Sequence, residues 1–149
     1  MKKKIQKIYQ DNGFGFPVTL LNVPMIEVRG EWVPNINQKD LQHKVLEALV
    51  VKHSRLSGNE VRFLRLFSKM TLEQFAERFD VTHPAVLKWE RAKNQPTAMS
   101  WMTEKDIRLF SLKQLEPKAQ RFVVVYEQLV QVASKKSKSI KIDLDKIPA

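Results

Sequence analysis

The sequence predicts a mainly α fold with a small β region at its N-terminus. Hydrophobic residues recur at helical spacing from about residue 39 to residue 133, whereas short β-prone runs are confined to the first third of the chain. The 149 residues suffice for one domain, or for two small ones that share a core. We therefore expect a β-rich segment (1–37), a helical domain (38–112), an amphipathic helix (113–133) and a basic tail (134–149).

Turn-forming residues divide the first third of the chain into three short runs with β propensity, at 18–23, 25–29 and 32–36. These runs predict a small antiparallel sheet or meander. From residue 39 the hydrophobic spacing changes to that of a helix, because Leu41, Val45 and Leu49 fall on one face. The helix that connects the β region to the rest of the chain is therefore expected at about 40–53.

The strongest local signals are three helix starts between residues 56 and 91. Ser57 with Glu60, and Thr71 with Gln74, have the spacing of capping boxes. Thr82 provides a third N-cap. These signals predict three successive short helices, at 58–69, 71–79 and 82–91.

The last two of these helices are separated by Asp80 and Val81 alone. So short a gap forces a sharp corner, which is the helix-turn-helix arrangement. Asp80 is one of the few residue types other than Gly that tolerate the positive φ such a corner often needs. The residues expected to face the core of this unit are Val61, Phe63, Leu64, Phe67, Leu72, Phe75, Ala76, Phe79, Val81, Val86 and Trp89.

Helical patterning returns at 100–110 and again from residue 117, where it persists over about four turns. The last helix either covers the helical core or pairs with its copy in a second subunit. Residues 140–145 alternate between apolar and polar types, so they form either an edge strand or part of a disordered tail.

The formal net charge is +10, which favours an anionic partner. Much of this excess lies at the two ends, since residues 1–7 contain four lysines and residues 134–149 carry a net +3. Residues 56–110 carry only +2. Basic ends serve nucleic-acid binding and solubility alike, so charge alone does not identify the partner.

Several function classes are excluded by what the sequence lacks. No run approaches the roughly 18 apolar residues of a membrane span, and no apolar stretch follows the Lys-rich start, so we expect a cytoplasmic protein without membrane contact. Absence of Cys excludes disulfides and thiolate zinc sites. Neither a nucleophile–base pair nor a metal-ligand spacing is found, so no enzyme, metal or cofactor is expected.

Residues 71–76 and 81–91 resemble the helix-turn-helix of Xre/Cro–cI type regulators, which have the lambda-repressor-like fold. The small Ala76, the hydrophobic residue at the corner and the Val-x-x-Trp-Glu ending carry this resemblance. Residues 56–65 resemble the first helix of the MqsA (YgiT-type) antitoxins. The resemblance implies a sequence-specific transcriptional repressor, and the antitoxin of a type II toxin–antitoxin pair that represses its own operon and neutralises an RNA-cleaving toxin.

This chain departs from the family in two respects. Members with a zinc-stabilised N-terminal domain hold the metal with CxxC pairs, whereas here a hydrophobic core would have to replace it, built from Phe16, Leu20, Val23, Ile26, Trp32 and Val33. Family members often have Gln at the first position of the scaffold helix and near the start of the reading helix. Leu72, Pro84 and Ala85 occupy those places here, so the contacts of such Gln residues do not carry over.

By the resemblance, the reading helix begins at Thr82 and enters the major groove of an operator. The hydroxyl of Thr82 and the N–H groups of the first turn would hold a phosphate, and His83 and Ala85 would face base edges. Lys88 would contact guanine or a phosphate. A two-fold homodimer would read two half-sites about 34 Å apart. The candidate DNA-binding residues are Thr71, Thr82, His83, Pro84, Ala85, Lys88, Arg91, Lys93, Asn94 and Gln95.

Two alternatives stay open. One is a solitary regulator without a toxin. The other is a protein-interaction module that has lost DNA binding, because residues 56–110 carry little net charge and lack the usual Gln contacts. In that case Lys88 and Arg91 are part of a solvated face.

Overall fold

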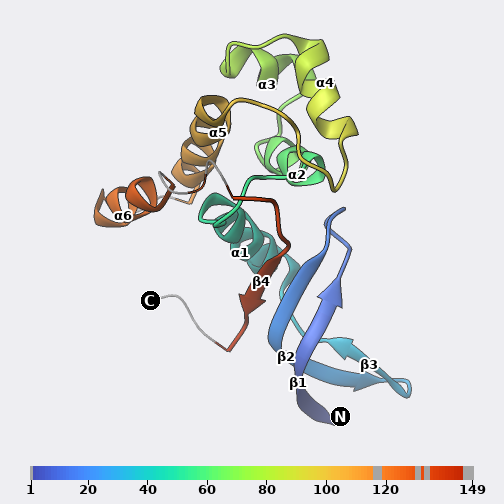
Figure 1. Cartoon of the computed structure of the whole chain (residues 1–149). Helices are drawn as coiled ribbons and strands as arrows, with labels where there is room; N and C mark the ends of the chain where they lie inside the picture. Colours follow the sequence, from blue (N-terminus) through green and yellow to red (C-terminus); the bar gives the residue numbers. More distant parts are fainter. Residues whose placement is uncertain (1, 116–118, 130–131, 133–134, 146–149) are drawn as a thin grey trace.

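The structure, a computed structural model, describes residues 2–115, 119–129, 132 and 135–145. Strands β1, β2 and β3 lie at one end of the molecule and helices α3 and α4 at the opposite end, with α1, α2 and α5 between them (Figure 1). The strands are β1 (Lys3–Asp11), β2 (Val18–Val28), β3 (Glu31–Pro34) and β4 (Ile140–Asp143). The helices are α1 (Gln38–Val50), α2 (Gly58–Phe67), α3 (Leu72–Arg78), α4 (His83–Arg91), α5 (Trp101–Lys113) and α6 (Ala119–Leu129).

The fold class predicted from the sequence is wrong, although the small N-terminal β region is present. Because six helices accompany a four-stranded mixed sheet in the described chain, the fold is α/β rather than mainly α. β2 is a single strand of 11 residues where the sequence predicted two short runs, and it pairs antiparallel with both β1 and β3. β1 was not among the predicted strands, because apolar and polar residues do not alternate along Lys3–Asp11. The strand buries little apolar surface, since its Ile5 and Ile8 are 65% and 57% exposed.

The C-terminal segment supplies the fourth strand. β4 runs parallel to the start of β2, with Ile140 opposite Val18 and Ile142 opposite Leu20. Both isoleucines are buried. The amide of Asn22 donates to Asp143 Oδ1 at 2.6 Å. The sequence left two interpretations of residues 140–145 open, an edge strand and a disordered tail, and the strand is confirmed.

The three N-caps predicted between residues 56 and 91 are confirmed. The hydroxyl of Ser57 accepts from the backbone N–H of Glu60, whose carboxylate accepts from the N–H of Ser57 at 2.8 Å. Thr71 and Gln74 form the same reciprocal pair. α1 begins two residues earlier than predicted, where Asn37 caps it, and its last residue is Val50.

Most of the residues predicted to be internal lie in one core, which joins the sheet to the helices. Phe63 of α2 makes edge-to-face contacts with Phe14 and Phe16, at 5.8 and 5.6 Å between ring centroids. Ile26, Trp32 and Val33 are only partly buried. The connection between β1 and β2 therefore packs against α2 through aromatic contacts.

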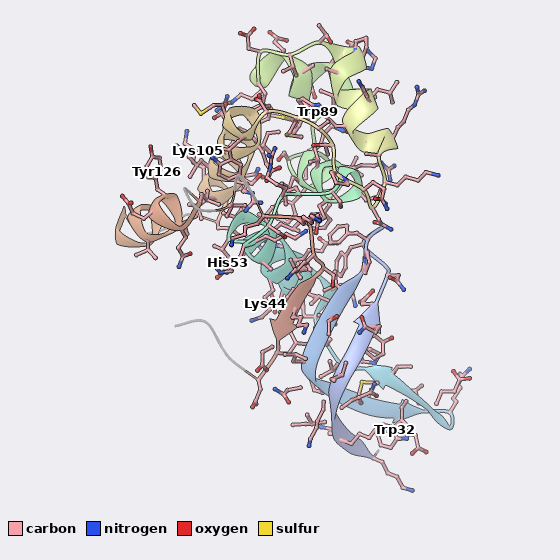
Figure 2. The ribbon with its side chains drawn as sticks, in the orientation of Figure 1. Trp32, Lys44, His53, Trp89, Lys105 and Tyr126 are labelled. Atoms are coloured by element: carbon pink, nitrogen blue, oxygen red, sulfur yellow. The ribbon has the colours of Figure 1, made fainter. Side chains whose placement is uncertain are left out.

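A smaller hydrophobic cluster holds α6 against the rest of the chain. Val125 and Leu129 are buried with Val50 and Leu112. Figure 2 shows Lys105 of α5 beside Tyr126 of α6, and the ammonium donates to the phenol oxygen at 3.3 Å. The packing of α6 within its own chain is thus observed, while pairing with a second copy stays a prediction. Within the part of the chain that is described, no helix combines the length and apolarity that crossing a bilayer requires.

Charged residues connect the segment after α1 with α2 and α5, and we call Lys52, Arg55, Glu60, Glu104 and Arg108 the charged junction. Arg55 is half-buried and the other four are buried. Glu104, which is fully buried, accepts from Arg55 Nε at 2.9 Å and from Arg108 Nη2 at 2.7 Å. Arg108 also donates to the carbonyl of Lys52 at 2.5 Å, just beyond the C-terminal end of α1. Lys52 Nζ lies 2.7 Å from Glu60 Oε1. The junction thereby fixes α1 against the helical end of the molecule.

Candidate nucleic-acid interface

The corner between α3 and α4 has the geometry that the sequence predicted. Asp80 adopts φ of 54°, in the left-handed region. The N–H of Val81 donates to the carbonyl of Ala76 at 3.0 Å, and the N–H of Asp80 donates to that of Glu77 at 3.3 Å. These are the two hydrogen bonds of a Schellman motif, and they end α3 while turning the chain into α4.

α4 has one buried and one exposed face. Val86 is buried, and Trp89 (Figure 2) is only 7% exposed, as predicted for a core residue. Pro84, Lys88 and Arg91 are exposed and are spaced by four and three residues, so they form one stripe along the helix. The inner contacts therefore determine which side chains α4 presents to solvent.

In the first turn of α4, fewer N–H groups remain to bind a phosphate than the sequence predicted. Thr82 accepts from the N–H of Ala85 at 3.2 Å, and Pro84 has no N–H. The side chain of Thr82 therefore has only its hydroxyl proton to donate to a phosphate. His83 and Pro84 are exposed, whereas Ala85 is half-buried.

The loop after α4 is held by the start of α2. The N–H groups of Gly58 and Asn59 donate to the carbonyls of Gln95 and Lys93, at 3.3 and 2.8 Å. The amide of Asn59 donates to Asn94 Oδ1 at 3.2 Å. The side chains of Lys93, Asn94 and Gln95 are nevertheless exposed, so this loop presents polar groups from a fixed backbone.

A glycine allows this close approach. A Cβ atom on Gly58 would lie 2.2 Å from the carbonyl oxygen of Trp89 and 2.9 Å from the backbone nitrogen of Lys93. Both are backbone atoms of α4 and its loop, so a side chain would have to displace them. Sequence reasoning missed this support, because the Ser57 capping box gives no signal about a partner 30 or more residues away.

The charges on α4 and its loop are arranged so that the cations face solvent. Glu90 accepts from Arg65 of α2 through two hydrogen bonds, of 2.6 and 2.9 Å, and its side chain is only 8% exposed. Such a bidentate pair neutralises the only acid between Thr82 and Gln95. The exposed charges of that segment are Lys88, Arg91 and Lys93. α3 presents Glu73 and Glu77 together with Arg78, whereas the exposed charges of α4 and its loop are all cationic.

Nine of the ten predicted residues thus lie together, from the cap of α4 to the loop after it. Thr71 lies apart, as the exposed cap of α3. Comparisons with protein-family models, curated proteins and solved structures found no match to this chain.

Proposed function

We propose that this protein is a cytoplasmic, sequence-specific DNA-binding repressor that reads an operator with α4. The observation that carries the proposal is the exposed stripe of Pro84, Lys88 and Arg91 on a helix whose other face is buried. A helix fits the major groove of B-DNA, and cations at its C-terminal end reach the flanking phosphates. α4 lies beside α3 at one end of the molecule, opposite the sheet (Figure 1).

The side chains of α4 suggest distinct roles. Lys88 is one turn beyond Pro84 and is exposed, so it is the best donor to guanine or to a phosphate. His83 donates to an acceptor on a base edge. Ala85, being half-buried, is limited to an apolar contact such as a thymine methyl. Asn94 keeps its amide N–H groups for the backbone of the duplex, because Asn59 occupies its oxygen.

The small number of base contacts supports a dimer. A good bidentate base contact provides about 1–3 kcal/mol of discrimination, and α4 offers few of them. Two copies that bind half-sites about 34 Å apart double this contribution. We therefore propose a two-fold homodimer on the operator.

The proposed antitoxin role rests on the resemblance of residues 56–65 to the first helix of MqsA-type antitoxins, next to a segment that resembles the helix-turn-helix of Xre/Cro–cI type regulators. An antitoxin gene has a small toxin gene beside it. If the neighbouring reading frame arrests growth when it is expressed alone, and this chain restores growth, the chain is an antitoxin. If no such frame exists, the protein is a solitary regulator.

A binding titration tests the repressor proposal. Fluorescence anisotropy with the chain's own upstream region should give tighter binding than unrelated DNA of equal length. Lys88→Ala should weaken specific binding by about 1–3 kcal/mol if Lys88 reads a base. Lys3→Ala is the matched control, because it removes the same charge from an exposed position on β1, at the other end of the molecule.

The other outcomes are equally informative. An equal loss on every sequence makes Lys88 a phosphate contact. If the folded protein binds no DNA at low salt, the repressor proposal is wrong and the protein-interaction module is favoured.

A further inference from the structure

A cavity of about 740 Å³ lies between the C-terminal end of α1 and the segment that leads into β4. It is far larger than a water site and falls within the range of about 300–1,000 Å³ for small-molecule pockets. Ala48, Val51 and Ile140 provide apolar surface. The cationic residues that line the cavity are Lys52, Lys135, Lys136, Lys138 and Lys141, and His53 lies among them.

The charged side chains among the described residues that line this cavity are all lysines. Among the described residues that line it there is no Asp or Glu. Lys52 already donates to Glu60, at 2.7 Å, and to the hydroxyl of Ser137, at 3.1 Å, so its ammonium group belongs to the charged junction. The positive charge that faces a ligand therefore comes from the four exposed lysines of residues 135–141.

Hydrogen bonds hold the wall that carries these lysines in place. The N–H of Arg55 donates to the carbonyl of Lys135 at 3.1 Å, and the N–H of Lys138 donates to the hydroxyl of Ser54 at 3.0 Å. Beyond them, β4 is paired with β2. The wall is thus tied to the residues after α1 at one end and to the sheet at the other, so the cavity exists before any ligand binds.

A neighbouring cavity indicates how a ligand would be oriented. It measures about 250 Å³ and is lined by His53, Lys135, Glu127, Gln128 and Val132. His53 is labelled in Figure 2, and it lines both cavities with Lys135. Because Glu127 makes the potential on that side less positive, an anionic group is favoured at the opposite side, near Lys138 and Lys141.

We propose that the cavity binds a small amphipathic anion: an organic phosphate, sulfonate or carboxylate with an apolar chain or ring. The anionic group contacts the lysines, whose mutual repulsion it relieves, and the apolar part lies against Ala48, Val51 and Ile140. This inference is independent of the proposed DNA binding, since the cavity is formed by α1 and the C-terminal segment.

Calorimetry on the full chain, with octyl phosphate below its micelle concentration as the probe, tests the proposal. We expect one molecule bound per chain, at least tenfold weaker binding of inorganic phosphate, and no binding of octyltrimethylammonium. The double variant Lys138→Gln/Lys141→Gln should weaken octyl phosphate binding at least tenfold. Lys3→Gln/Lys7→Gln removes the same charge from exposed positions on β1 and should leave binding unchanged.

A second variant tests the cavity itself. Ser139 is exposed and lines the cavity, so Ser139→Trp should occupy part of it and weaken binding while circular dichroism shows an unchanged fold. Several outcomes overturn the proposal: no binding by the folded wild type, equal losses in both lysine double variants, equal binding of inorganic phosphate, or undiminished binding by folded Ser139→Trp. None of them bears on DNA binding, because no DNA is present.

Discussion

The N-terminal caps of α2, α3 and α4 and the charged junction differ in the sequence distance over which their contacts act. In α2–α4, each cap joins residues three positions apart, as with Thr82 and Ala85. In the charged junction, Arg55 meets Glu104 across 49 positions, and Arg108 meets Lys52 across 56. The first region can begin to form from its own sequence, whereas the second exists only when α1, α2 and α5 have assembled. Substitutions in the two regions should therefore have different energetic consequences.

The largest effect is expected in the charged junction. Glu104→Gln should destabilise the protein by about 3–5 kcal/mol, because Arg108 and Arg55 would then lack the charge that compensates their burial. Urea denaturation measures this loss. Glu77→Gln changes the same groups at an exposed position of α3 and should alter stability by less than about 0.5 kcal/mol. Similar losses for the two variants would show that the junction is not more sensitive than the surface.

The Lys52–Glu60 pair gives a second test. Burial lowers the pKa of Lys52, and the charge of Glu60 opposes this shift only in part. Lys52→Met alone should cost about 3 kcal/mol, because it leaves the Glu60 carboxylate buried without its cation. Adding Glu60→Gln should restore more than half of that loss, since Gln keeps the capping-box contact with Ser57. Urea denaturation of the two single variants and the double variant measures the interaction energy of the pair. If the two losses of unfolding free energy simply add, the pairing is contradicted.

A third variant probes the place where α2 supports α4. Gly58→Ala should cost about 1–3 kcal/mol, because the new methyl group meets backbone atoms of Trp89 and Lys93 that cannot move independently. In Gly13→Ala, the added methyl meets only the carboxylate of Asp11, so we expect little change in melting temperature. If Gly58→Ala melts like the wild type, the close approach of α2 to the loop is not required.

The smallest effect is expected for a local cap. Thr82→Ala removes the acceptor of the Ala85 N–H and should destabilise the protein by about 1 kcal/mol, whereas Thr82→Ser should be nearly neutral. Chemical denaturation of both variants resolves the difference. A loss of several kcal/mol for Thr82→Ala would mean that α4, too, depends on long-range contacts at its start.

The parts of the fold that were predicted are those whose signal lies within a few residues. The capping boxes of Ser57 and Thr71, the left-handed Asp80 and the buried Trp89 were all read from such signals. β1 and β4 were harder to predict, because a strand obtains its hydrogen bonds from a partner and here that partner, β2, is needed to define both. The same limitation produced the wrong fold class.

The candidate interface also has features that the sequence predicted and features that it did not. Sequence spacing was sufficient to group the residues from Thr82 to Gln95 on one helix and its loop. It did not indicate that Asn59 engages Asn94 or that Arg65 neutralises Glu90, because these partners lie 35 and 25 positions apart. It also treated residues 135–141 as a tail, whereas in the structure their lysines line a cavity.

The amino-acid sequence alone determined where helices α2, α3 and α4 begin and how α3 turns into α4, because caps and a left-handed corner act within one turn of helix. The tertiary structure decided that the chain has a mixed sheet, that Arg55 pairs with Glu104 of α5, and that lysines distant from α1 in sequence surround one cavity beside it. Strand pairing and charge burial depend on groups that only the folded chain brings together, and no local pattern encodes them.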